Sequence, residues 1–111
     1  MSALYKMIYA GGTGDGFGVV ALSKGKVLGA DVGDFRYDGS YVESGDRVKL
    51  TATMTASANG GVLVTGMAVP PGQKLQLAAD WPASFADGAE QTILVAGSPV
   101  KVRFEKIGDL P

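Results

Sequence analysis

Residues 46–56 alternate apolar and polar side chains without a break, and this period of two restricts the fold more than any other feature of the chain. The apolar side consists of Val48, Leu50, Ala52, Met54 and Ala56. The other side consists of Arg47, Lys49, Thr51, Thr53 and Thr55. This alternation, with β-branched residues on the polar side, predicts a strand with one face buried and the other in water.

Seven further segments are predicted to be strands, and most are separated by short turns rich in glycine, proline or polar residues. They are residues 3–10, 16–22, 26–31, 35–42, 73–81, 91–96 and 99–106. No convincing helical period is present. Residues 57–69 allow two interpretations, which are a loop with a short strand or a flap across one end of the fold.

Eight consecutive strands in an all-β chain favour a small antiparallel up-and-down β-barrel. Closure into a barrel removes the exposed strand edges that would otherwise invite pairing with other chains. A barrel of this size has an interior just wide enough for side chains or for one small ligand. The length of 111 residues fits a single domain over residues 1–111.

The residue types that are missing exclude several kinds of chemistry. The chain has no cysteine, so it has neither a disulfide framework nor a thiolate metal site. It has no histidine, the commonest general base and metal ligand. The sequence therefore assigns no catalytic residue, no metal site and no cofactor, and it predicts a protein that is not an enzyme.

Charge and hydropathy indicate where such a protein works. The formal net charge of −1 gives no reason to expect binding to nucleic acid. No apolar run reaches the roughly 18 residues of a membrane helix, so no membrane association is expected. The N-terminus lacks the pattern of a signal peptide, and the sequence therefore predicts a cytoplasmic protein.

The inward faces of the predicted strands carry the candidate ligand-binding residues. These are Phe35, Tyr37, Tyr41, Leu50, Met54, Leu77, Trp81 and Phe104. Two interpretations stay open for them, an ordinary packed core or an apolar pocket with a few phenolic hydrogen-bonding groups. Small inner residues favour the pocket because Gly39, Ala52 and Ala79 leave volume that either the large residues must fill or a ligand can use.

Three short patterns suggest other chemistry, and each has a simpler explanation. GFGVVA at residues 16–21 matches a dinucleotide-binding pattern, but the helix that would hold the pyrophosphate has no room before the next turn. The carboxylates are expected to be solvated charges at turns and strand ends rather than a calcium or acid–base site; they are Asp31, Asp34, Asp38, Glu43 and Asp46. Residues 59–61, Asn-Gly-Gly, are predicted to form a tight turn.

The order of LYKMIY, GFGVVAL and KVLGADVGDFRYDGSYVESGDRVKL resembles the GrlR-like family, negative regulators of type III secretion in bacteria. The resemblance covers roughly residues 3–56 through these motifs and the rest through strand pattern. It implies a lipocalin-like, or calycin-like, eight-stranded barrel with an apolar interior, commonly paired as a homodimer. It also implies a regulatory protein that acts by binding and sequestering a partner protein.

The same resemblance singles out the loop between two predicted strands as a partner-binding site. The founding regulator carries four consecutive acidic residues in a surface loop. Glu43 and Asp46 match the two ends of that run, whereas Ser44 and Gly45 depart from it. By itself the loop is predicted to be an exposed hairpin turn, with Gly45 available for positive φ. A carrier or sensor of a small apolar ligand is the alternative function.

Overall fold

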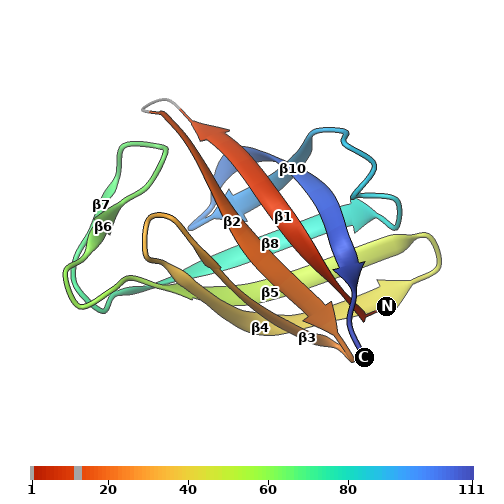
Figure 1. The fold of residues 1–111 in the computed structure, drawn as a ribbon. Helices are drawn as coiled ribbons and strands as arrows, with labels where there is room; N and C mark the ends of the chain where they lie inside the picture. Colours follow the sequence, from red (N-terminus) through yellow and green to blue (C-terminus); the bar gives the residue numbers. More distant parts are fainter. Residues whose placement is uncertain (1, 12–13) are drawn as a thin grey trace.

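Eight strands follow one another around a closed antiparallel barrel in the computed structural model, which describes residues 2–11 and 14–111 (Figure 1). The barrel strands are β1 (Ser2–Gly11), β2 (Gly14–Ser23), β3 (Lys26–Asp31), β4 (Arg36–Ser44), β5 (Arg47–Thr55), β8 (Lys74–Pro82), β9 (Gln91–Val95) and β10 (Ser98–Asp109). Each pairs with the next along the chain, and β10 pairs with β1 to close the ring. This confirms the predicted eight-stranded up-and-down barrel.

The period-two alternation decides which side chains face the interior. The residues predicted to be inside from the three clearest strands are buried: Val48, Leu50, Met54, Leu75, Leu77, Val100, Val102 and Phe104. Lys49, Lys101 and Arg103, which alternate with them, are exposed. None of the described residues lies in a helix long and apolar enough to cross a membrane.

The segment between β5 and β8 forms a small hairpin of β6 (Gly61–Val62) and β7 (Ala68–Val69). Figure 1 shows this hairpin, called the flap below, at the end of the barrel where β3 turns into β4. Leu63 at the flap is buried. The Ser57 carbonyl accepts hydrogen bonds from the amides of Gly60 and Gly72, at 3.0 Å each, which joins the two legs of the flap. Of the two interpretations of residues 57–69, the structure shows the flap.

An aromatic cluster fills the barrel beyond the tryptophan. Phe85 comes from the connection between β8 and β9, and its ring centroid lies 5.0 Å from that of Tyr5 and 5.1 Å from that of Trp81. Phe104 lies 4.7 Å from Trp81 and meets Phe85 edge-on. Tilted and edge-on ring pairs at these distances add stability beyond the area that they bury. The interior is therefore packed solid at this end.

Candidate functional site

A cavity of about 210 Å³ lies inside the barrel between the flap and the aromatic cluster. Seven of the eight residues predicted for the interior line it: Phe35, Tyr37, Leu50, Met54, Leu77, Trp81 and Phe104. The flap contributes Leu63 and its two neighbours. For scale, an engineered cavity of roughly 150 Å³ in another protein stays dry and binds benzene. These seven residues line one largely apolar space inside the barrel, and their role in binding a ligand stays a prediction.

Tyr41 is the exception among the predicted cavity residues, because it is buried but does not line the cavity. It follows Tyr37 by four residues on the same face of β4, which places it about 13 Å further along the strand, beyond the cavity floor. The expectation about Gly39 was also wrong. A Cβ at Gly39 would collide with the Thr51 carbonyl of the neighbouring strand, so this glycine permits close backbone approach and leaves no usable space. Of the small inner residues, Ala52 does line the cavity.

A carboxylate and two phenols sit together at the flap end of the cavity, and Asp31 is at their centre. Its Oδ1 atom accepts hydrogen bonds from the backbone amides of Gly33, at 2.8 Å, and Phe35, at 3.2 Å. The Tyr37 hydroxyl donates to its Oδ2 atom. Tyr9 lies close enough to Asp31 for the carboxylate to raise the pKa of its phenol. Each of the three side chains lines the cavity.

The surroundings of both phenols hold them in the neutral, proton-donating form. Burial raises the pKa of Tyr37 far above its ordinary value, and the negative charge of Asp31 and its hydrogen bond raise the pKa further. The pKa of Tyr9 is raised for the same reasons in the same order. Loss of either proton would place a second negative charge beside the carboxylate in a poorly solvated space. Both phenols therefore keep their protons at neutral pH, and the Tyr37 hydroxyl donates its proton to Asp31.

Two glycines on β2 and β3 leave room for the phenol rings. Gly16 lies opposite Tyr9 in the β1–β2 ladder, and a Cβ on this glycine would overlap the Tyr9 ring. Gly29 lies opposite Tyr37 in the β3–β4 ladder, where a Cβ would come within 3.0 Å of the ring. Each ring thus lies over a position without a side chain.

Sequence reasoning missed the inward position of Asp31 and the role of Tyr9, although the same period-two rule applies to both. Asp31 shares its face of β3 with buried Val27, and Tyr9 shares its face of β1 with buried Met7. Asp31 was assigned to the solvated charges because it lies at the end of a strand.

Asp34 and Asp38, which the sequence places near Asp31, do not join it in the structure. Asp38 lies on the outer side of β4, with its carboxylate 3.9 Å from the Lys26 ammonium and both side chains well exposed. Asp34 is exposed in the turn before β4, with φ of 64°. Within the described part of the chain, no group of three or more acidic residues could hold a metal ion.

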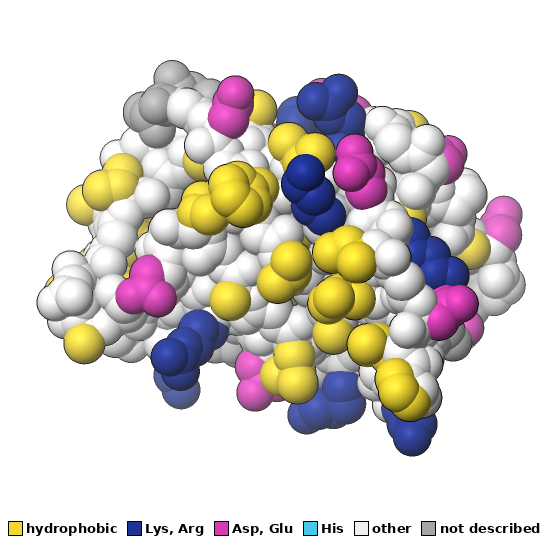
Figure 2. Space-filling view, in the orientation of Figure 1, with side chains coloured by type: hydrophobic (Ala, Val, Ile, Leu, Met, Phe, Trp, Pro, Cys, Tyr) yellow, Lys and Arg dark blue, Asp and Glu magenta, His cyan; other side chains and the backbone are white. Residues whose placement is uncertain are grey.

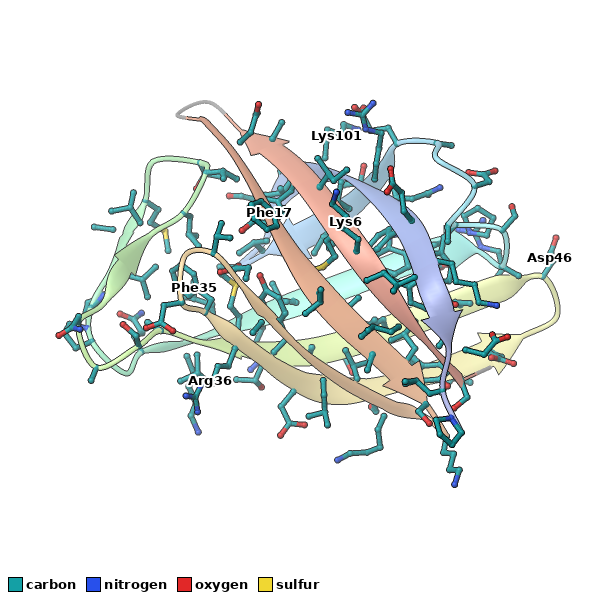
Figure 3. The ribbon with its side chains drawn as sticks, in the orientation of Figure 1. Lys6, Phe17, Phe35, Arg36, Asp46 and Lys101 are labelled. Atoms are coloured by element: carbon teal, nitrogen blue, oxygen red, sulfur yellow. The ribbon has the colours of Figure 1, made fainter. Side chains whose placement is uncertain are left out.

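The predicted partner loop lies at the opposite end of the barrel from the cavity mouth. Figure 3 shows Asp46 pointing into solvent at one end and Phe35 beside the flap at the other. Glu43, Ser44, Gly45 and Asp46 are all exposed. Gly45 has φ of 60°, as expected for a glycine in a two-residue hairpin turn. The Ala83 amide donates to the Asp46 carbonyl at 2.6 Å, which ties the turn to the chain after β8.

The outer wall of the barrel carries exposed apolar residues over β2 and β3. Phe17, Val19 and Leu28 are each more than two fifths exposed. Figure 2 shows hydrophobic side chains gathered on this wall, with basic side chains among them. Lys6 lies opposite Val19 in the β1–β2 ladder. An exposed face with several apolar side chains together is more typical of a surface that contacts another molecule than of one that contacts only water.

Comparison with protein-family models, with curated proteins and with solved structures found no match to this chain.

Proposed function

We propose that this protein binds one small apolar molecule inside its barrel, as a carrier or sensor. The observation that supports this most is the cavity of about 210 Å³ beneath the flap. Protein interiors are close-packed, and the few voids that they contain are seldom larger than a water molecule. Space of this size costs stability unless something occupies it.

The shape of the cavity indicates how a ligand would lie. Its floor is the indole of Trp81 and the ring of Phe104, and its mouth is at the flap beside Asp31. An amphiphile would therefore place its apolar chain on the aromatic floor and its head at the mouth. Scaled from the cavity that holds benzene, the space suits a chain of about eight carbons rather than a long membrane lipid.

The binding energy of such a chain follows from the surface that it loses to water. At about 0.8 kcal/mol for each methylene group, an octyl chain contributes about 5–6 kcal/mol, which corresponds to a Kd of roughly 0.1 mM before any contribution from the head. We therefore expect measurable but moderate affinity for simple octyl compounds.

The fluorescence of Trp81, the only tryptophan, tests the proposal because its side chain lines the cavity. Titration with 1-octanol should shift the emission and reach saturation, and native mass spectrometry of the purified protein should show one bound molecule. An emission spectrum that does not change with 1-octanol or with a hydrophobic dye would refute the proposal.

Binding of a partner protein is the second candidate, and the exposed acidic turn favours it together with the resemblance to the GrlR-like family. Glu43 and Asp46 would face a basic surface of a regulatory protein, and exposed charges of this kind mainly change association rate and salt dependence. The homodimer implied by the resemblance stays a prediction. The apolar wall over β2 and β3 is the surface that a second copy would cover.

Reversing the charge of the turn tests the partner hypothesis. The double change Glu43→Lys with Asp46→Lys should weaken binding to a basic partner by up to about 1 kcal/mol for each residue, and more at low salt. Stability should hardly change because an exposed turn has few buried contacts. The matched control is Asp38→Lys with Glu105→Lys, which places the same charges on the outer wall. Equal binding by both double variants at every salt concentration would leave the turn without a recognition role.

A further inference from the structure

The hydrogen bonds at the mouth leave Asp31 with little capacity to accept another. A carboxylate has about four lone-pair sites. Two backbone amides bond to its Oδ1 atom, and the Tyr37 hydroxyl bonds to its Oδ2 atom. A ligand head at this mouth therefore meets a carboxylate most of whose acceptor sites are already occupied.

The two phenol oxygens are the groups that such a head would meet. The Tyr37 hydroxyl proton is directed to Asp31, so this oxygen presents its remaining lone pairs. An oxygen in this state accepts a hydrogen bond but has no second proton to donate. The Tyr37 oxygen thus offers an acceptor to a ligand, and a head that can only accept would find no donor in it.

The charges around the cavity favour the same kind of ligand head as the hydrogen bonds do. The described residues that line the cavity include two carboxylates, Asp15 and Asp31, and no lysine or arginine. Arg36 follows Phe35 in the chain, but it points away from the barrel (Figure 3). An anionic head at the mouth would therefore be repelled, with no cation from the lining to offset the cost of leaving water.

We propose that the ligand of this cavity carries a head that donates hydrogen bonds and is not anionic, such as an alcohol or a protonated amine, and that Asp31 excludes carboxylates, phosphates and sulfates. This inference rests on the proposed function, because it names the chemical class of the ligand for the same site.

A matched series with one chain and three heads tests this selectivity. The probes are 1-octanol, octylamine as its ammonium ion and octanoate, each titrated into the intact protein at neutral pH and followed by calorimetry and Trp81 fluorescence. Octanol and octylamine should bind, and octanoate should bind about tenfold more weakly or worse, as expected for like charges a few ångströms apart in a partly buried site.

Replacement of Asp31 by asparagine tests the assigned cause. The amide oxygen of Asn can still accept from the Gly33 and Phe35 amides, so the turn keeps its hydrogen bonds. The amide nitrogen would donate to the Tyr37 phenol oxygen, and the phenol proton would become available to the ligand. In Asp31→Asn, the preference for octanol over octanoate should fall to about one. The control is Asp38→Asn, which removes the same charge from the outer wall and should keep the wild-type preference.

The outcomes separate this inference from the proposal on which it rests. Saturable binding of all three probes with equal affinity would overturn the head-group selectivity and leave the cavity as a ligand site. Failure of all three to bind would overturn both. Titration of the three probes into the wild-type protein tests the head-group selectivity even if Asp31→Asn does not fold.

Discussion

At the scale of single residues, the cavity mouth depends on two positions without side chains as much as on the side chains that line it. Gly16 and Gly29 lack the Cβ atoms that would collide with the rings of Tyr9 and Tyr37. With the rings in these positions, Tyr37 reaches Asp31 from the neighbouring strand β4, and Tyr9 approaches it from β1, on the far side of β2. The buried Tyr37 phenol beside this carboxylate makes the stability of the fold sensitive to alkaline pH.

In Tyr37→Phe, the free energy of unfolding should decrease less steeply with pH at high pH than in the wild type. An unfolded tyrosine loses its proton near pH 10, whereas the native Tyr37 keeps it because its pKa is raised. The contribution of Tyr37 to the free energy of unfolding is therefore complete below pH 10. It is lost as pH rises above 10, by up to about 1.4 kcal/mol for each pH unit. Urea unfolding of both proteins at several pH values from 9 upward measures the slopes, and equal slopes would contradict the raised pKa.

At the scale of elements, the flap lines one end of the cavity through Leu63 and its two neighbours. It packs on the barrel through small apolar contacts: a Cβ at Gly61 would come within 2.8 Å of the Phe35 ring, and Leu63 is buried at the mouth. An element held by few apolar contacts opens at low cost. In the proposed function, opening of the flap would therefore admit a ligand without disturbance of the barrel strands.

Leu63→Ala should speed the release of a bound octyl ligand while the barrel stays folded. The change removes apolar contact at the mouth worth about 1–2 kcal/mol, which corresponds to a several-fold to about thirtyfold faster dissociation. Stopped-flow measurement of Trp81 emission after dilution gives the rate. Met67→Ala is the control because Met67 lies on the same flap, is exposed and does not line the cavity. Equal rates in the two variants would mean that Leu63 does not close the mouth.

The elements that sequence could predict are those in which one face is buried over several residues. The boundaries predicted for 26–31 match β3, and those for 46–56 differ from β5 by one residue at each end. The flap and Phe85 lie outside any periodic segment, so alternation carried no information about them. Phe85 is nevertheless among the most completely buried residues. An aromatic residue inside a short polar connection was the signal available.

At the scale of the whole molecule, the two ends of the barrel differ. Both termini and the turn that contains Asp46 lie away from the flap (Figure 1). The aromatic cluster closes that end, and the cavity opens at the other. Alternation predicted closure of the sheet, but not which end would be filled, because this depends on one phenylalanine and one flap. A ligand at the mouth and a partner at the acidic turn would therefore not compete for the same surface.

The measurement that tests the central claim most directly is calorimetric titration of 1-octanol into wild type, Ala52→Leu and Ala78→Leu. Ala52 lines the cavity, and Ala78 is exposed on the outer side of the neighbouring strand β8. The added carbons of leucine at position 52 would take the place of about three ligand carbons, which weakens binding by about 2 kcal/mol, or more than tenfold. Wild type and Ala78→Leu should bind alike, and Ala52→Leu should stay folded but bind far more weakly. Equal affinity of all three proteins, or no binding by wild type, would contradict a ligand site inside the barrel.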